Sequence, residues 1–183
     1  MASICVYCAS SDSIDPAYLE LATAVGVRLA RDGHSLVSGG GRVSMMGAVA
    51  RAARAGGAHT VGVIPSHLVP YEVADGDADE LLVVETMRER KRIMDERSDV
   101  FMALPGGIGT LEELFEIWTS SSLGMHPKPV IVLDPFGFYA PLWTWLEDLV
   151  GRGFVRQQAL DTLHRVSSVD EAFAVVDRPG GPA

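Results

Sequence analysis

One segment of the chain has the composition of a phosphate-binding turn: Pro105-Gly-Gly-Ile-Gly-Thr110. It joins the apolar run at residues 100–104 to a stretch in which apolar residues recur at helical spacing. At the start of a helix, free backbone N–H groups and the helix dipole together attract an anion. Glycine suits such a turn because a Cβ would block close approach of the backbone to a ligand. We therefore predict that Gly106, Gly107, Gly109 and the Thr110 hydroxyl bind a phosphate.

A second glycine cluster, residues 39–41, also follows an apolar strand and precedes a helix. It predicts either a further phosphate contact or only a tight turn, and the sequence leaves both open. The G-x-G-x-x-G dinucleotide fingerprint is absent, because Ala9-Ser-Ser-Asp12 follows the first strand, and no Walker lysine follows Gly109. The predicted ligand is therefore a mononucleotide. Ser10 and Ser11 either bind it or only satisfy the loop backbone.

Glu113 has two explanations. Thr110-Leu-Glu-Glu113 fits the S/T-x-x-E pattern of a capping box, which would give this carboxylate a structural role. The same position lies one helical turn from the predicted phosphate, where the carboxylate would face the sugar of a nucleotide. The pattern alone does not decide between the two.

A charged helix is predicted at residues 87–97, and it places one arginine among apolar neighbours. At about 100° per residue, Arg90 shares an arc with Met87, Lys91, Met94 and Arg97, while Arg88 and Arg92 lie on the opposite, solvated side. An arginine on a partly apolar face is costly without a partner, so a carboxylate or phosphate is expected beside Arg90. Glu113 is the natural candidate.

The cysteines and histidines do not form a metal or redox site in this interpretation. Cys5 and Cys8 resemble half of such a site, but in a strand their odd separation sends the side chains to opposite faces, so we expect buried structural thiols. The five histidines are dispersed, without an H-x-x-x-H pair. The sequence predicts no catalytic metal.

Short apolar strands alternate with amphipathic helices along the chain. Strands are expected at residues 4–8, 35–38, 60–64, 81–84, 100–104 and 130–133, with helices from Pro16 after an Asp15 cap, at 46–55, at 87–97, after Thr110 and at 142–150, and a last strand and helix within 165–176. This alternation predicts an α/β fold, a Rossmann-like doubly wound parallel sheet with helices on both faces. One domain, residues 1–177, is followed by a tail, residues 178–183.

Composition limits the partners of the chain. Its 183 residues, 48% of them hydrophobic, suit one well-filled domain. The formal net charge of −9 opposes binding to nucleic acid and to anionic membranes, although a small anion can still bind locally. The N-terminus lacks a basic region, and no apolar run approaches the roughly 20 residues that span a bilayer. We expect a cytoplasmic protein.

The motif Pro105-Gly-Gly-Ile-Gly-Thr-Leu-Glu-Glu113 resembles the P-G-G-x-G-T-x-x-E signature of the LONELY GUY (LOG) family of cytokinin riboside 5′-monophosphate phosphoribohydrolases, formerly mislabelled as lysine decarboxylases. The resemblance extends over essentially the whole chain, from the opening C-V-Y-C-A-S-S to Leu123-Gly124. Met87-Arg88-Glu89-Arg90-Lys91 matches the family motif M-H-x-R-K, except that Arg88 replaces the histidine. Because Arg88 faces away from Arg90 in the helical projection, we expect activity to survive this change.

The resemblance implies a reaction and a set of site residues. The reaction is hydrolysis of the N-glycosidic bond of an N6-modified adenosine 5′-monophosphate, with AMP itself left open as a second substrate. Arg90 and Glu113 would be the catalytic pair, no cofactor would be needed, and the chain would form a homodimer. The implied substrate-binding residues are Glu72, Arg90, Lys91, residues 107–113 and Thr119.

Two other functions remain in view. A non-catalytic protein that senses AMP-like nucleotides would use the same glycine turns, and would differ only in what Arg90 and Glu113 do. A pyridoxal-phosphate lysine decarboxylase needs a Schiff-base lysine, for which only Lys91 and Lys128 exist. We expect neither to be suitable, because Lys91 adjoins the arginine cluster and Lys128 lies in a loop between two prolines.

Overall fold

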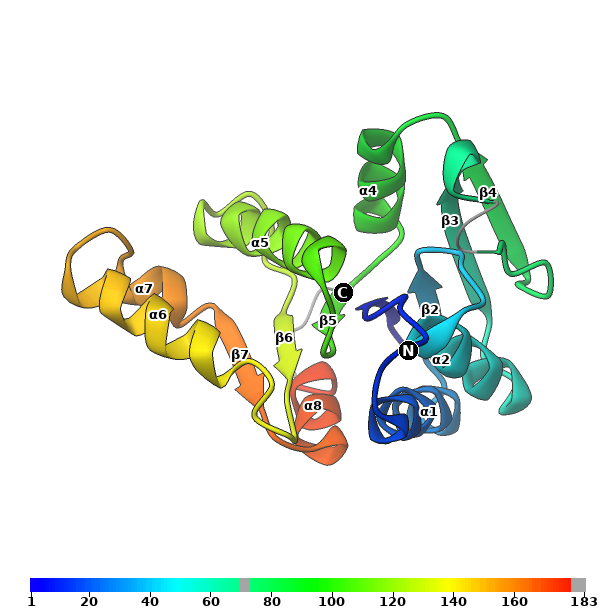
Figure 1. The fold of residues 1–183 in the computed structure, drawn as a ribbon, viewed down its shortest axis with the longest axis horizontal. Helices are drawn as coiled ribbons and strands as arrows, with labels where there is room; N and C mark the ends of the chain where they lie inside the picture. The colour runs from blue at the N-terminus through cyan, green and yellow to red at the C-terminus, as the bar shows by residue number, and fades with distance from the viewer. Residues whose placement is uncertain (70–72, 179–183) are drawn as a thin grey trace.

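The computed structural model describes residues 1–69 and 73–178, and it contains one sheet with helices on both faces (Figure 1). The strands are β1 (Ser3–Tyr7), β2 (Ser35–Ser38), β3 (Thr60–Pro65), β4 (Glu80–Val84), β5 (Val100–Ala103), β6 (Val130–Leu133) and β7 (Leu163–Val166). The helices are α1 (Pro16–Arg31), α2 (Ser44–Ala55), α4 (Met87–Glu96), α5 (Ile108–Ser122), α6 (Ala140–Gly151), α7 (Gln157–Leu160) and α8 (Val169–Val176), with a 3₁₀ turn at Ser66–Leu68.

The sheet is parallel throughout, in the order β4-β3-β2-β1-β5-β6-β7. The chain winds outward from β1 to β4, then returns to place β5 on the other side of β1. In a doubly wound sheet, ligands bind outside the carboxyl ends of the strands where this reversal occurs. Here that position lies between β1 and β5. The predicted α/β class, the Rossmann-like winding and the single domain are confirmed.

Two apolar cores sandwich the sheet because its strands carry apolar side chains on both faces. One core joins the sheet to α1, α2 and α8, and the other joins it to α4, α5 and α6, which lie on the opposite face in Figure 1. Cys5 belongs to the second core and Cys8 to the first, so the expected separation of the two thiols is confirmed.

Element boundaries mostly follow the local signals. Asp15 caps α1 through a hydrogen bond from the Ala17 N–H (2.9 Å) to its carboxylate, as expected from the sequence. α2 begins at Ser44, two residues before the predicted start, and the short α7 was not predicted. Of the predicted tail, only Arg178 lies within the described residues.

None of the described helices is long and apolar enough to cross a bilayer.

Candidate functional site

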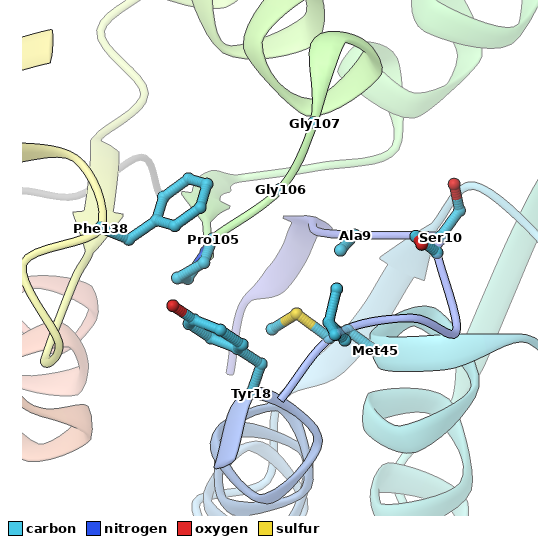
Figure 2. A pocket seen from close by; sticks show the side chains of 10 residues that line it. Ala9, Ser10, Tyr18, Met45, Pro105, Gly106, Gly107 and Phe138 are labelled. Carbon is cyan, nitrogen blue, oxygen red and sulfur yellow. The ribbon is translucent and has the colours of Figure 1, made fainter. Parts of the chain in front are cut away.

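Two loops meet between β1 and β5, where the order in which the chain adds strands to the sheet reverses (Figure 2). The loop after β1 and the loop after β5 are held together by hydrogen bonds from the Leu104 N–H to the Tyr7 carbonyl (2.9 Å) and from the Ala9 N–H to the Pro105 carbonyl (3.2 Å). The glycine turn therefore lies beside the loop that contains Ser10, at the carboxyl edge of the sheet.

The glycine turn leads directly into α5. Gly107 is the N-cap residue, and no side chain of the described residues caps this end of the helix. Thr110 is already inside the first turn and buried, so the capping-box explanation of Thr110 and Glu113, which the sequence left open, does not hold. The first N–H groups of a helix have no acceptor within the helix, and here they are available to a ligand.

The glycines of this turn have different structural causes. A Cβ on Gly106 would lie 2.1 Å from the Thr110 hydroxyl oxygen, so close packing excludes any other residue there. A Cβ on Gly107 or Gly109 would meet no atom of the described residues within 4 Å. Packing against residues 1–69 and 73–178 therefore does not explain these two glycines, whereas close approach of a ligand to the backbone would.

Arg90 projects from α4 into the interior and is 5% exposed. Its Nη2 donates a hydrogen bond to the Gly39 carbonyl (3.2 Å), and Nη1 lies 3.8 Å from the Met87 sulfur. A Cβ on Gly39 would lie 1.9 Å from Nη2. The glycine cluster at residues 39–41 thus makes room for a guanidinium, and Gly40 adds a turn with φ +74°.

The predicted faces of α4 are largely confirmed. Arg90 and Met94 are buried, whereas Arg88 and Arg92 are exposed. Arg97 does not share the buried face, because it is the C-cap residue and its side chain is exposed.

Arg90 and Glu113 line the same cavity, of about 160 Å³, which we call the Arg90–Glu113 cavity. Its other lining residues are Cys8, Ser10, Met46, Met87, Gly107, Ile108, Gly109, Thr110 and Glu112. An arginine, a carboxylate and the start of a helix are therefore arranged around a space that fits a small anion with a sugar-sized group. The sequence did not predict Met46 as a site residue; it marked Met46 only as the start of a predicted helix.

Other predicted site residues lie elsewhere. Lys91 is paired with the carboxylates of Glu112 and Glu116 and lines a neighbouring cavity of about 230 Å³, which Glu113 and Arg88 also line. Partial burial opposes the charge of Lys91, but the two carboxylates outweigh it and raise the pKa of Lys91.

Thr119 does not line the Arg90–Glu113 cavity. Thr119 lies on the outer side of α5, where its hydroxyl donates to the Phe115 carbonyl (2.7 Å), and it lines a separate groove against α6. Glu72 falls outside the described residues.

Cys8 lines the cavity without being a nucleophile. Burial, with a smaller contribution from the charge of Glu113, raises the pKa of the Cys8 thiol well above its usual range. Burial also raises the pKa of Cys5, to about 12. Both thiols stay protonated at neutral pH, as expected of structural cysteines.

Comparison with known proteins places the chain in a family. A family model described as "Possible lysine decarboxylase" matches residues 46–176. This chain is 52% identical to each of two proteins named cytokinin riboside 5′-monophosphate phosphoribohydrolase, from Mycobacterium marinum and Mycobacterium tuberculosis. Each match covers 93% of this chain and 91% of the relative. The chain belongs to the LOG family. In this LOG chain, the range matched by the family model contains Arg90, the glycine turn and Glu113.

Solved structures support the fold of the LOG chain. A molybdenum cofactor carrier protein from Chlamydomonas reinhardtii superposes with a TM-score of 0.73, covering 95% of this chain and 94% of its own. The two sequences are 22% identical, so the likeness concerns the fold alone.

Proposed function

We propose that this chain hydrolyses the N-glycosidic bond of N6-modified adenosine 5′-monophosphates to the free base and ribose 5-phosphate. The observation that carries the proposal is the shared cavity of Arg90 and Glu113 at the start of α5, in a chain 52% identical to proteins named for this activity. AMP itself is a candidate second substrate.

The phosphate of the substrate binds at the glycine turn in this proposal. The N–H groups of residues 107–110 supply donors, the α5 dipole favours the negative charge, and Gly107 and Gly109 leave the backbone open. A site of this kind works in a chain with net charge −9 because its field is local.

Glu113 and Arg90 have different roles in the proposed bond cleavage. The glycosidic bond breaks through a sugar with oxocarbenium character, so the Glu113 carboxylate stabilises the developing positive charge and orients or deprotonates the attacking water. Arg90, held by the Gly39 carbonyl, positions Glu113 and the ribose phosphate. Neither role uses a metal or a cofactor.

Glu72, Lys91 and Thr119 complete the proposed substrate-binding set, although they are placed differently from the catalytic pair. Lys91 would act from α4 through the carboxylates of α5 with which it is paired. Thr119 faces away from the Arg90–Glu113 cavity within one chain. The homodimer and the cytoplasmic location also stay predictions, and light scattering of the purified chain measures the first.

A pyridoxal-phosphate lysine decarboxylase does not fit these residues. Lys91 is occupied by two carboxylates, and Lys128 donates to the carbonyl and carboxylate of Asp95 (both 2.7 Å). Lys128 also precedes β6, at the amino edge of the sheet, while the glycine turn lies at the carboxyl edge. Neither lysine is placed to form a Schiff base at the candidate site.

The test is to incubate the purified chain with AMP and with N6-isopentenyladenosine monophosphate, and to measure released base by chromatography. The proposal expects free base and ribose 5-phosphate in equal amounts from the modified nucleotide. Binding of both nucleotides without any release of base would favour the non-catalytic nucleotide sensor instead.

A further inference from the structure

The turn that contacts Arg90 is held in place by a second segment of the chain. Residues 39–42 connect β2 to α2, and the Gly39 carbonyl in this turn accepts a hydrogen bond from Arg90. Residues 73–75, which come before β4, run antiparallel beside the turn. We call residues 73–75 the strap.

Two backbone hydrogen bonds join the strap to the turn. The Arg42 N–H donates to the Val73 carbonyl (3.0 Å), and the Asp75 N–H donates to the Gly40 carbonyl (2.8 Å). Together they form one isolated antiparallel bridge. Val73 has a φ of +45°, which a β-branched residue rarely adopts. Backbone strain of this kind persists only where the surrounding contacts maintain it.

The turn is also packed closely against β3. Gly40 has a φ of +74°, and a Cβ on it would lie 3.1 Å from the Ile64 Cβ. A Cβ on Gly62 would lie 2.9 Å from the Gly40 Cα. The turn is therefore held by close packing against the sheet and by hydrogen bonds with the strap.

An ion pair anchors the strap to α2. Arg54 lies in the last turn of α2, where the helix dipole favours a positive charge. Its guanidinium donates two hydrogen bonds to the Asp75 carboxylate, from Nη1 to Oδ2 (2.8 Å) and from Nη2 to Oδ1 (3.1 Å). Side chains on a helix tilt toward its N-terminus, so Arg54 extends back toward the turn that precedes α2.

The pair is largely buried, since the Asp75 side chain is 6% exposed and the Arg54 side chain 18%. A buried ion pair adds little net stability, because the cost of removing two charges from water offsets their attraction. Its two parallel hydrogen bonds instead fix the relative orientation of the two groups. Accurate placement of the strap, more than stability, is what this geometry provides.

A continuous series of contacts connects Arg54 with the candidate site. Asp75 binds Arg54 through its carboxylate and the Gly40 carbonyl through its backbone N–H. The adjacent Gly39 carbonyl accepts the hydrogen bond from Arg90 Nη2, at 3.2 Å. A shift of the strap would therefore move an acceptor that orients the Arg90 guanidinium.

We propose that Arg54 and Asp75 are positioning residues: their ion pair holds the strap, and through it the turn and Arg90, in the arrangement that bond cleavage requires. The inference rests on the proposed phosphoribohydrolase function. Both residues lie outside the lining of the Arg90–Glu113 cavity, so they act through Arg90 and not on the substrate.

The test measures kcat for N6-isopentenyladenosine monophosphate after Asp75→Asn, once in the wild type and once in an Arg90→Ala background. Asp75→Asn keeps the size of the side chain and removes the charge that Arg54 binds. A misplaced positioning group costs up to about 10²-fold in rate, so we expect kcat to fall at least about tenfold in the wild type. In the Arg90→Ala background the same substitution should change kcat by less than about twofold, because the group it positions is gone.

Asp32→Asn is the matched control. Asp32 is also a partly buried carboxylate paired with an arginine, Arg28, but it lies before β2, at the amino edge of the sheet. Its substitution should leave kcat at the wild-type value. Thermal unfolding of each variant shows whether the protein is folded at the temperature of the assay.

Arg54→Lys is a second variant, which tests the pair without leaving Asp75 unpaired. It keeps the positive charge but loses the bidentate geometry, so kcat should fall less than in Asp75→Asn, and again only when Arg90 is present. Wild-type kcat in the folded variants, or an equal fall with and without Arg90, would overturn the positioning role. Failure of the wild type to release base would contradict the proposed function, and this inference with it.

Discussion

At the scale of single residues, the surroundings of Glu113 distinguish a helix-capping role from a chemical one. Its carboxylate does not cap α5, since the helix begins at Ile108 and Gly107 is its N-cap. Glu113 instead lies one turn into the helix and lines the cavity that contains Arg90. A change that removes its charge while keeping its shape should therefore affect chemistry more than stability.

We expect Glu113→Gln to lower turnover by about 10²-fold or more, because the neutral amide no longer stabilises the developing positive charge on the sugar. Binding of AMP should be largely retained. Single-turnover release of base and equilibrium AMP binding measure the two effects separately. Glu147→Gln, an exposed carboxylate on α6, is the matched control. Near-normal turnover in folded Glu113→Gln protein would reject the proposed chemistry.

Gly39 provides an indirect test of Arg90. A Cβ at this position would lie 1.9 Å from the Arg90 Nη2, so Gly39→Ala must displace the guanidinium. A small misplacement of a positioning group costs about 10²-fold in rate, and we expect a fall in kcat of that order. Gly151→Ala, where an added Cβ meets no atom of the described residues within 4 Å, should leave kcat unchanged. Wild-type kcat in Gly39→Ala would mean that Arg90 does not position the reacting groups.

At the scale of elements, the start of α2 is unusual. Ser44 is the first residue of the helix, yet its φ is +49°, a region that residues with a Cβ rarely adopt. Two hydrogen bonds to the loop after β1 hold it there. The first turn of α2 is thus shaped by a neighbouring loop and not by helix propensity.

The positive φ of Ser44 predicts that glycine is more stable than alanine at this position, the reverse of their usual order inside a helix. Ser44→Ala keeps the strained φ and loses the hydroxyl hydrogen bond, whereas Ser44→Gly loses the hydrogen bond but relieves the strain. We expect the alanine variant to be less stable than the glycine variant by about 1 kcal/mol, measured by denaturant unfolding. At Glu20, an exposed position inside α1, alanine should be the more stable of the two by about 1 kcal/mol. The same order at both positions would contradict the strain at Ser44.

At the scale of the whole molecule, the two edges of the sheet have different roles. The glycine turn and the Arg90–Glu113 cavity lie at the carboxyl edge. Asp32, His34 and Asp177 form a group of ligand atoms within 4.8 Å of one another, but His34 immediately precedes β2 and so lies at the amino edge. Any cation bound there would be remote from Glu113.

The atoms of this group are also committed to other contacts. His34 Nδ1 accepts a hydrogen bond from the Ala2 N–H (3.1 Å), so the ring proton of the neutral imidazole is on Nε2, which faces the Asp177 carboxylate at 3.5 Å. Asp32 is paired with Arg28 and Arg31, and the hydrogen bond from Arg28 is the main cause of its lowered pKa. This arrangement does not favour a metal.

We therefore expect dialysis against EDTA to leave turnover and Tm unchanged, and added Zn²⁺ to leave Tm unchanged as well. Turnover assays and thermal unfolding of the same samples provide the measurements. Loss of turnover that a divalent ion restores would refute the metal-independent chemistry, and a Tm raised by Zn²⁺ would refute the interpretation of the His34 group.

The sequence by itself determined the architecture. Alternating strands and helices, the Asp15 cap and the buried face of Arg90 and Met94 are local signals, since each depends on residues a few positions apart. The glycine turn between β5 and α5 was visible for the same reason. The local pattern around Thr110 left a capping box open as one explanation of Glu113, and the structure excludes it because α5 includes Thr110 and has Gly107 as its N-cap residue.

Only the tertiary structure decided what surrounds these residues. Gly39 and Arg90 are 51 positions apart, and the need for glycine there arises from a guanidinium that no local pattern connects with it. The pairing of Lys91 with two α5 carboxylates, the outward position of Thr119 and an apolar cavity between α1, α2 and the loop before α6 (Figure 2) likewise depend on contacts between distant segments. Periodicity reports which face of an element is buried, but the partner of that face is fixed by how the elements pack.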